Sequence, residues 1–254
     1  MLSGRPPSTQ LGIDQLLDRL VSGSSRQKRS TASALEKVSE QLSGQADVAL
    51  KAYAPEGDDW GAGWILQILQ RHHPETLDAI PGVSGGWFQM PSSCGIAYSA
   101  LQRALLKEEF EEADRLTSCA LRQLAGELAV ERGYMYFSEV PSIKPVDLTT
   151  IDRLWIAYSQ GRFGFTVQSR LLRALGGRYD RLWPKIGWKY DSVWTRYPGS
   201  FQWCMDAPEG HMPLVNQLSA DRNMHAHRSA LSQEWCARCR QLKFRSPISK
   251  PQCE

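Results

Sequence analysis

Apolar residues recur at helical spacing along the first third of the chain. Four leucines between Leu11 and Leu20 follow an approximate period of 3.6 residues, and Gly23 ends this run. The same pattern predicts three further helices, from about Thr31 towards Val48, from Trp64 to about His72, and from Glu75 to Ile80. Short helices with tight turns fit either a small helical bundle or a fragment of a solenoid, and no internal repeat decides between the two.

A turn-rich stretch at residues 81–95 is the best domain boundary, since it combines prolines, glycines and paired serines. Beyond it, apolar stripes predict a helical hairpin led by Tyr98 and by Phe110. Further helices are expected with Thr149 and Thr166 as N-caps, the first closed by Gly161, followed by a short helix around Trp183. We therefore predict an all-α fold with an N-terminal helical bundle (residues 1–90), a core domain (94–235) and a tail (236–254).

The helical pattern stops at residues 186–213, where aromatic residues alternate with glycines and prolines. The rings are Trp188, Tyr190, Trp194, Tyr197, Phe201 and Trp203. A long loop is usually polar, so these rings either pack the loop against the domain or present a flat apolar ligand with a surface. The nearby cations Lys185, Lys189 and Arg196 favour a planar aromatic ligand with peripheral carboxylates, because rings stack on its face and cations pair with its acids.

Composition excludes several other classes of protein. The 30 basic and 27 acidic residues leave a net charge of +3, too small a bias for a dedicated nucleic-acid binder. The longest basic cluster, residues 26–29, is flanked by serines and is expected to be a solvated linker. The chain has no apolar run of membrane-spanning length and no signal-peptide pattern, so we expect a soluble, non-secreted protein, with peripheral membrane contact left open.

Cysteines and acids offer two candidate sites that we interpret conservatively. Six scattered cysteines indicate reduced thiols rather than a disulfide scaffold. The zinc-competent ligands near the C-terminus are His225, His227, Cys236 and Cys239, but helical geometry sends two histidines one residue apart to different faces, so we favour a solvated tail over a metal site. Four glutamates at residues 108–112 suit the dipole at a helix start, and we assign them no chemistry.

Five stretches of the second half carry a specific resemblance. They are DLTTIDRLW at 147–155, SQGRFGFTVQ at 159–168, LWPKIGWK at 182–189, VWTR at 193–196 and APEGHMPL at 207–214. In order and spacing they are similar to the core of the genomes-uncoupled-four family, over roughly Cys94 to Trp235. The separate helical N-terminal region is similar to the extra bundle of cyanobacterial members.

The resemblance implies a helical core shaped like a cupped hand that binds protoporphyrin IX and its magnesium complex. It implies stimulation of magnesium chelatase, through the large porphyrin-binding subunit, in chlorophyll synthesis, with no catalysis and no catalytic cofactor. A monomer in the cytoplasm of a cyanobacterial cell, with thylakoid contact open, is expected. Carried over by position, the porphyrin-binding residues would be Phe137, Trp194, Arg196, Tyr197, Phe201, Trp203, Leu214, Asn216, Leu218 and Arg222.

Two positions depart from the best-known members of that family. Tyr197 stands where they have tryptophan, which keeps a stacking face, and Ser219 stands where they have a basic residue. The loss of that cation would weaken binding by about 1 kcal/mol or more, with Arg222 as the remaining partner for a carboxylate. His211 could ligate magnesium axially, but its neighbours Gly210 and Pro213 favour a hydrogen-bonded role in a rigid turn.

Two rival functions follow from the same residues. An enzyme of tetrapyrrole metabolism is disfavoured because the sequence shows no Ser-His-Asp or Cys-His set, no phosphate-binding glycine loop and no metal quartet. A helical scaffold of tetrapyrrole enzymes without a ligand-dependent role would instead use the exposed faces of the N-terminal helices.

Overall fold

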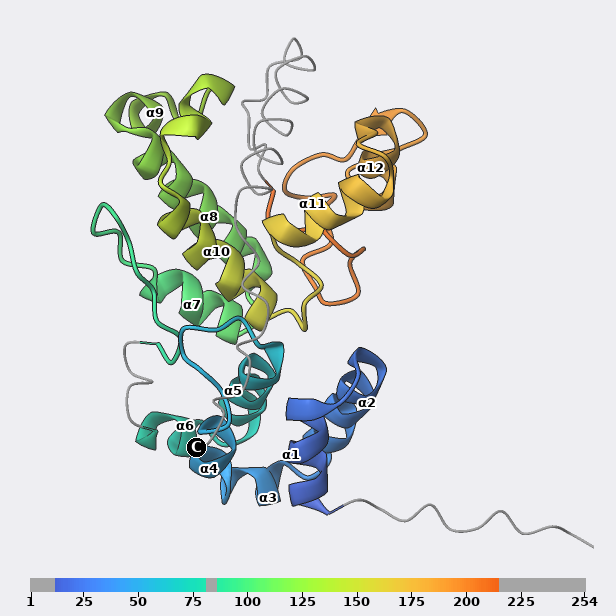
Figure 1. Ribbon diagram of the computed structural model, residues 1–254. Helices are drawn as coiled ribbons and strands as arrows, with labels where there is room; N and C mark the ends of the chain where they lie inside the picture. Colours follow the sequence, from blue (N-terminus) through green and yellow to red (C-terminus); the bar gives the residue numbers. More distant parts are fainter. Residues whose placement is uncertain (1–11, 81–85, 215–254) are drawn as a thin grey trace, which may run out of the picture.

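The computed structural model describes residues 12–80 and 86–214, and it is built almost entirely of helices (Figure 1). The first group is α1 (Ile13–Ser22), α2 (Ser25–Glu36), α3 (Ser39–Ser43), α4 (Ala46–Leu50), α5 (Trp60–His72) and α6 (Pro74–Ala79). The second is α7 (Ser99–Leu106), α8 (Phe110–Ala125), α9 (Glu127–Arg132), the 3-10 helix η2 (Phe137–Ser142), α10 (Pro145–Ala157), α11 (Phe165–Ala174) and α12 (Tyr179–Lys185). The all-α prediction is confirmed.

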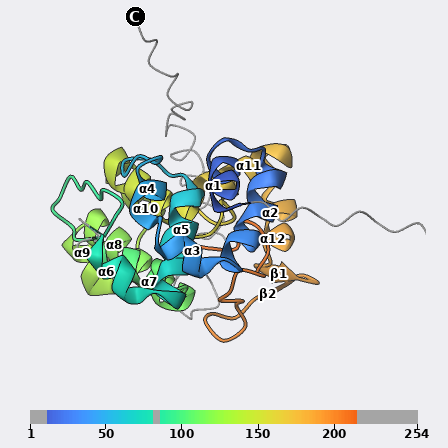
Figure 2. The same ribbon diagram turned by 90° about the horizontal axis from the view of Figure 1, so that it is seen from below.

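A two-stranded antiparallel hairpin interrupts the segment predicted as one loop. β1 (Lys189–Tyr190) pairs with β2 (Val193–Trp194) and lies beside α12 (Figure 2). The turn residues Asp191 and Ser192 both have positive φ, 43° and 69°, as a two-residue hairpin turn requires. Among the helices of the described residues, none combines the length and the apolar character needed to cross a membrane.

The interpretation of residues 26–29 as a linker is wrong, because these residues lie inside α2. Ser24 and Gln27 form a capping box: the Ser24 hydroxyl accepts from the Gln27 amide, and the Gln27 side chain accepts from the Ser24 amide. This cap starts the helix six residues before the predicted Thr31. The single helix predicted from there towards Val48 is divided into α2, α3 and α4, and Val48 is exposed.

Both threonines predicted as N-caps lie within helices instead. Pro145 begins α10, and the Thr149 hydroxyl donates to the carbonyl of Pro145 one turn earlier. At α11 the cap comes from another helix, because buried Asp152 of α10 accepts from the Thr166 amide at 3.1 Å. α10 ends at Ala157 with Tyr158 as its C-cap, so the predicted Gly161 lies three residues beyond the cap, where it has φ of 71° and its amide donates to the carbonyl of Ile156.

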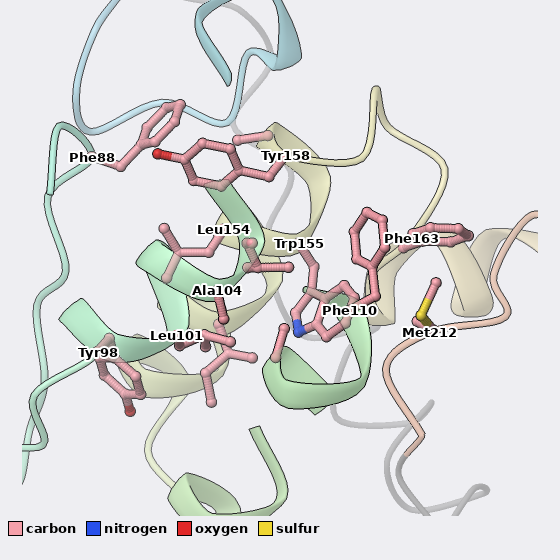
Figure 3. Close-up of a cluster of buried hydrophobic side chains, with 14 of the residues drawn as sticks. Phe88, Tyr98, Leu101, Ala104, Phe110, Leu154, Trp155, Tyr158, Phe163 and Met212 are labelled. Carbon is pink, nitrogen blue, oxygen red and sulfur yellow. The ribbon is translucent and has the colours of Figure 1, made fainter. Parts of the chain in front are cut away.

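The centre of the molecule is an aromatic core between α7, α8 and α10 (Figure 3). Phe110 stacks on Trp155 with ring centroids 6.2 Å apart, and its ring meets the edge of Phe163 at 5.7 Å. The Trp155 indole donates to the Thr117 hydroxyl at 3.0 Å, so this buried polar atom is satisfied. The core therefore orients α8, whose first turn faces the aromatic loop.

Asp147 fixes the segment that enters this core. The buried carboxylate accepts from the Ser92 hydroxyl at 2.6 Å, from the Ser93 amide and hydroxyl, and from the Tyr98 hydroxyl at 2.9 Å. Burial alone would raise the pKa of Asp147, but these hydrogen bonds outweigh it and hold the pKa below its usual value. Asp147 thus joins residues 92–98 to the start of α10.

Candidate functional site

Helix α12 and the hairpin form a stack of tryptophans that supports the loop. The rings of Trp183 and Trp188 are parallel within 5° at 5.5 Å, and the Trp188 indole donates to the His211 carbonyl at 2.7 Å. Trp194 lies 5.8 Å from Trp183, and the Lys189 ammonium sits 5.5 Å from the Trp194 ring. Trp183 and Trp188 are buried, so these two rings pack the loop against the domain.

His211 has the hydrogen-bonded role that its neighbours favoured. Its Nδ1 lies 2.6 Å from the Ile186 carbonyl, and its Nε2 lies 3.3 Å from the Gln202 amide, which donates to it. The ring therefore carries its proton on Nδ1 and uses both nitrogens. Burial lowers the pKa of His211, so the imidazole is neutral at pH 7. With Nε2 engaged by the backbone, His211 organises the loop rather than offering a free nitrogen to a metal.

The end of the loop is anchored to the start of α11. Gly164 donates to the Met212 carbonyl at 3.0 Å, and Gly210 donates to the Arg162 carbonyl at 2.8 Å. The buried Gln168 amide donates to the carbonyls of Gly210 and Pro213. These bonds give an irregular segment a fixed path, which is a requirement for a preorganised site.

Three rings of the loop gather into one cluster, which we call the aromatic wall: Tyr197, Phe201 and Trp203. Their centroids are 5.7 to 6.1 Å apart, and Tyr197 meets Trp203 edge to face at 88°. Phe201 also lies 5.1 Å from the His211 ring, while the Trp203 indole donates to the Pro198 carbonyl. Tyr197 keeps 41% of its surface exposed, so the wall presents ring surface to solvent.

A cavity of about 430 Å³ lies between the aromatic wall and the first turns of α8. Its lining residues are Glu108, Glu109, Phe110, Glu111, Glu112, Arg115, Tyr197 and Trp203. The acidic cluster to which we assigned no chemistry therefore faces two predicted porphyrin-binding residues. Sequence reasoning missed this neighbourhood, and missed Arg115, because the two segments are more than 80 residues apart and neither carries a signal of the other.

Charges at the cavity are partly paired. Arg115 holds Glu112 through two bonds of 2.6 Å, and this pairing lowers the pKa of Glu112. Burial raises the pKa of Tyr197 to about 12, with Asp114 and Glu111 adding to the rise. Tyr197 is thus a neutral phenol at pH 7, and its ring can stack on an apolar ligand without the cost of burying a charge.

The remaining predicted site residues are more dispersed. Trp194 belongs to the tryptophan stack, and Arg196 is exposed on the loop between that stack and the aromatic wall. Leu214 is buried and its amide donates to the Asp114 carboxylate of α8 at 2.6 Å, while Phe137 begins η2, which packs against α8. Asn216, Leu218, Ser219 and Arg222 lie outside the described residues, as do the four candidate zinc ligands. Within the described part of the chain, no three metal-ligating side chains converge.

The fold and the site define a helical protein in which an open cavity lies between the aromatic loop and the glutamate-rich start of α8. The GUN4-like family model matches residues 91–230, which is more than half of the chain. The chain belongs to this family, the genomes-uncoupled-four family that the sequence resembles, and residues 12–80 lie outside the matched segment.

Individual relatives agree with the family assignment. A Ycf53-like protein of Synechocystis is 42% identical over 158 residues, covering 62% of this chain and 64% of the relative. The chloroplastic tetrapyrrole-binding protein of Arabidopsis thaliana is 38% identical over 130 residues, covering 48% of this chain and 49% of the relative. The chain thus spans less than two thirds of the length of these curated relatives. The structure of GUN4 from Chlamydomonas reinhardtii matches with a TM-score of 0.52 and 34% identity, covering 59% of this chain and 90% of that one.

Proposed function

We propose that this chain binds a tetrapyrrole, protoporphyrin IX or its magnesium complex, against the aromatic wall and that it regulates an enzyme instead of catalysing a reaction. The observation that carries the proposal is the cluster of exposed Tyr197 and partly buried Phe201 and Trp203 beside an open cavity of about 430 Å³, which Tyr197 and Trp203 line. A porphyrin is flat and apolar on both faces, and edge-to-face aromatic walls bind such a surface well.

The charges around the site favour one orientation of the ligand. Propionates are disfavoured next to the glutamates at the start of α8, of which the N-cap residue Glu109 and Glu111 form no ion pair within the described residues. Arg196 is exposed, directly precedes Tyr197 in the loop and is not among the residues that line the cavity. We infer that the apolar edge of the macrocycle enters the cavity and that the propionates point outward towards Arg196.

The regulatory part of the proposal rests on family membership. The Arabidopsis relative carries the name tetrapyrrole-binding protein, and membership in the GUN4-like family supports a binding role. We propose that the loaded protein stimulates magnesium chelatase through its large, porphyrin-binding subunit. Chelatase assays with and without the chain test this step separately from binding. A scaffold without a ligand-dependent role would give the same stimulation after the aromatic wall is removed.

Binding itself is tested by titration of protoporphyrin IX, followed by its visible absorbance. The double variant Tyr197→Ala/Trp203→Ala should bind at least about ten-fold more weakly, because two stacking faces are lost. Tyr190→Ala is the matched control, since Tyr190 is 55% exposed on the hairpin and does not line the cavity. Equal affinity in the wild type and the double variant, with circular dichroism unchanged, would rule out this site.

A further inference from the structure

Helix α5 packs against the segment matched by the family model, residues 91–230, through three residues spaced four apart. Gly63, Gln67 and Arg71 occupy positions i, i+4 and i+8, which lie on one face of a helix. At Gly63 the backbones are so close that an added Cβ would overlap the Ala157 carbonyl oxygen. The buried Gln67 amide donates to the carbonyls of Tyr158, at 2.9 Å, and Leu105, at 3.2 Å. Two of the three positions therefore fix α5 firmly against α7 and α10.

The third of these residues reaches the turn between α7 and α8. Arg71 Nη1 donates to Glu108 at 2.6 Å, and Nη2 donates to Glu36 of α2 at 2.7 Å. The guanidinium also lies 4.8 Å from the Trp64 ring, and about two thirds of its side chain is covered. Arg71, on α5, thus links Glu36 of α2 to Glu108 in the turn between α7 and α8.

Glu108 has a left-handed backbone conformation in that turn. Its φ of 59° lies in the left-handed region, which residues other than glycine enter only when the surrounding structure holds them there. Glu108 and the next residue, Glu109, both line the cavity opposite Tyr197 and Trp203. The bond from Arg71 therefore fixes the wall of the cavity that faces the aromatic rings.

We propose that the N-terminal helices position this wall for the ligand and that Arg71 is the positioning residue. Residues 12–80 lie outside the family segment, yet through Arg71 they set the place of the α7–α8 turn. This inference rests on the proposed function, because the property that Arg71 tunes is affinity for the tetrapyrrole. Arg71 lies outside the set of residues that line the cavity, so it acts through Glu108.

The test compares Arg71→Gln and Glu108→Gln with the wild type in the full chain. The first measurement is the affinity for protoporphyrin IX by visible absorbance, and each variant should bind about two- to five-fold more weakly, as expected for a half-buried ion pair. The double variant should be no worse than Arg71→Gln alone, because Arg71→Gln already removes the bond to Glu108. Lys51→Gln is the control, since it removes another N-terminal ion pair, with Asp47, away from the turn.

A charge swap separates positioning from a general loss of stability. In a Glu36→Gln background, Arg71→Glu combined with Glu108→Arg restores an ion pair of reversed polarity, and hydrogen exchange of residues 105–110 should return to within about two-fold of that background. Hydrogen exchange of residues 105–110 in the ligand-free protein is the second measurement, and it should be faster in Arg71→Gln than in Lys51→Gln. Unchanged exchange would overturn the inference, as would unchanged affinity in a chain that binds. Failure of the wild type to bind would overturn the proposed function, while the exchange result would still decide whether Arg71 holds the turn.

Discussion

Asp152 of α10 caps α11 by accepting a hydrogen bond from the Thr166 amide at 3.1 Å. The carboxylate is 4% exposed, and Gly164 lies so close that an added Cβ would be 2.7 Å from its Oδ1. Burial raises the pKa of Asp152 to about 6, although the amide bonds from Thr166 and Phe165 oppose the rise. Burial therefore disfavours the charged form of Asp152 in the folded protein relative to the same group in the unfolded chain.

Asp152→Asn should change how stability depends on pH. The folded pKa lies above the unfolded value, so Asp152 takes up a proton on folding between about pH 6 and pH 4 and stabilises the fold as pH falls through that window. Asparagine keeps an oxygen for the Thr166 amide but cannot titrate. Relative to the variant, the wild type should gain on the order of 3 kcal/mol from pH 7 to pH 4. Urea unfolding of both proteins at several pH values measures this difference, and parallel curves would contradict the cap.

Gly63→Ala should destabilise the protein even though alanine favours helices. The added methyl group meets the Ala157 carbonyl, and overpacking of this kind costs about 1 to 3 kcal/mol, more than the gain in helix propensity of about 1 kcal/mol. Gly44→Ala is the control, because its nearest neighbour would be at an ordinary 3.7 Å. Thermal unfolding should show a lower midpoint for Gly63→Ala alone, and equal midpoints would mean that α5 and α10 do not approach this closely.

His211→Phe should loosen the aromatic loop. The variant keeps a ring beside Phe201 but leaves the Ile186 carbonyl and the Gln202 amide without a partner, at a cost of about 1 to 3 kcal/mol. Because burial lowers the pKa of His211, the wild type favours neutral imidazole and loses stability as pH falls below about 6.5. The destabilisation by His211→Phe, measured by denaturant unfolding, should therefore shrink between pH 7 and pH 5. A constant difference would contradict the neutral, doubly bonded ring.

Regular helices were predictable because their signals are local. The periodic leucines of α1, the glycine at its C-cap and the apolar stripe of α8 all lie within a few turns of chain. The N-caps at Thr149 and Thr166 were wrong for a related reason. Pro145 supplied a stronger local start for α10, and the cap of α11 came from Asp152, on a different helix, which no local pattern contains.

The site shows the same division between local and long-range information. The aromatic character of the loop is visible in the sequence, which left open whether its rings pack against the domain or face a ligand. In the structure Trp183 and Trp188 are buried and stacked, while Tyr197 is exposed. The sequence could not place the glutamates of α8 opposite Tyr197 and Trp203, because that contact depends on the tertiary path fixed by His211 and Gln168. Family membership is shown, while the individual binding residues stay predictions.

The bonds from Gln67 bear on how shortened versions of this protein should be understood. A protein cut to begin after residue 80 would leave the carbonyls of Leu105 and Tyr158 facing water, and Ala157 would lose the helix that covers it. Its melting temperature and ligand affinity would describe a core with one side uncovered. Laboratory comparisons between long and short relatives should therefore treat the presence of α5 as an experimental variable, as they would a bound ligand.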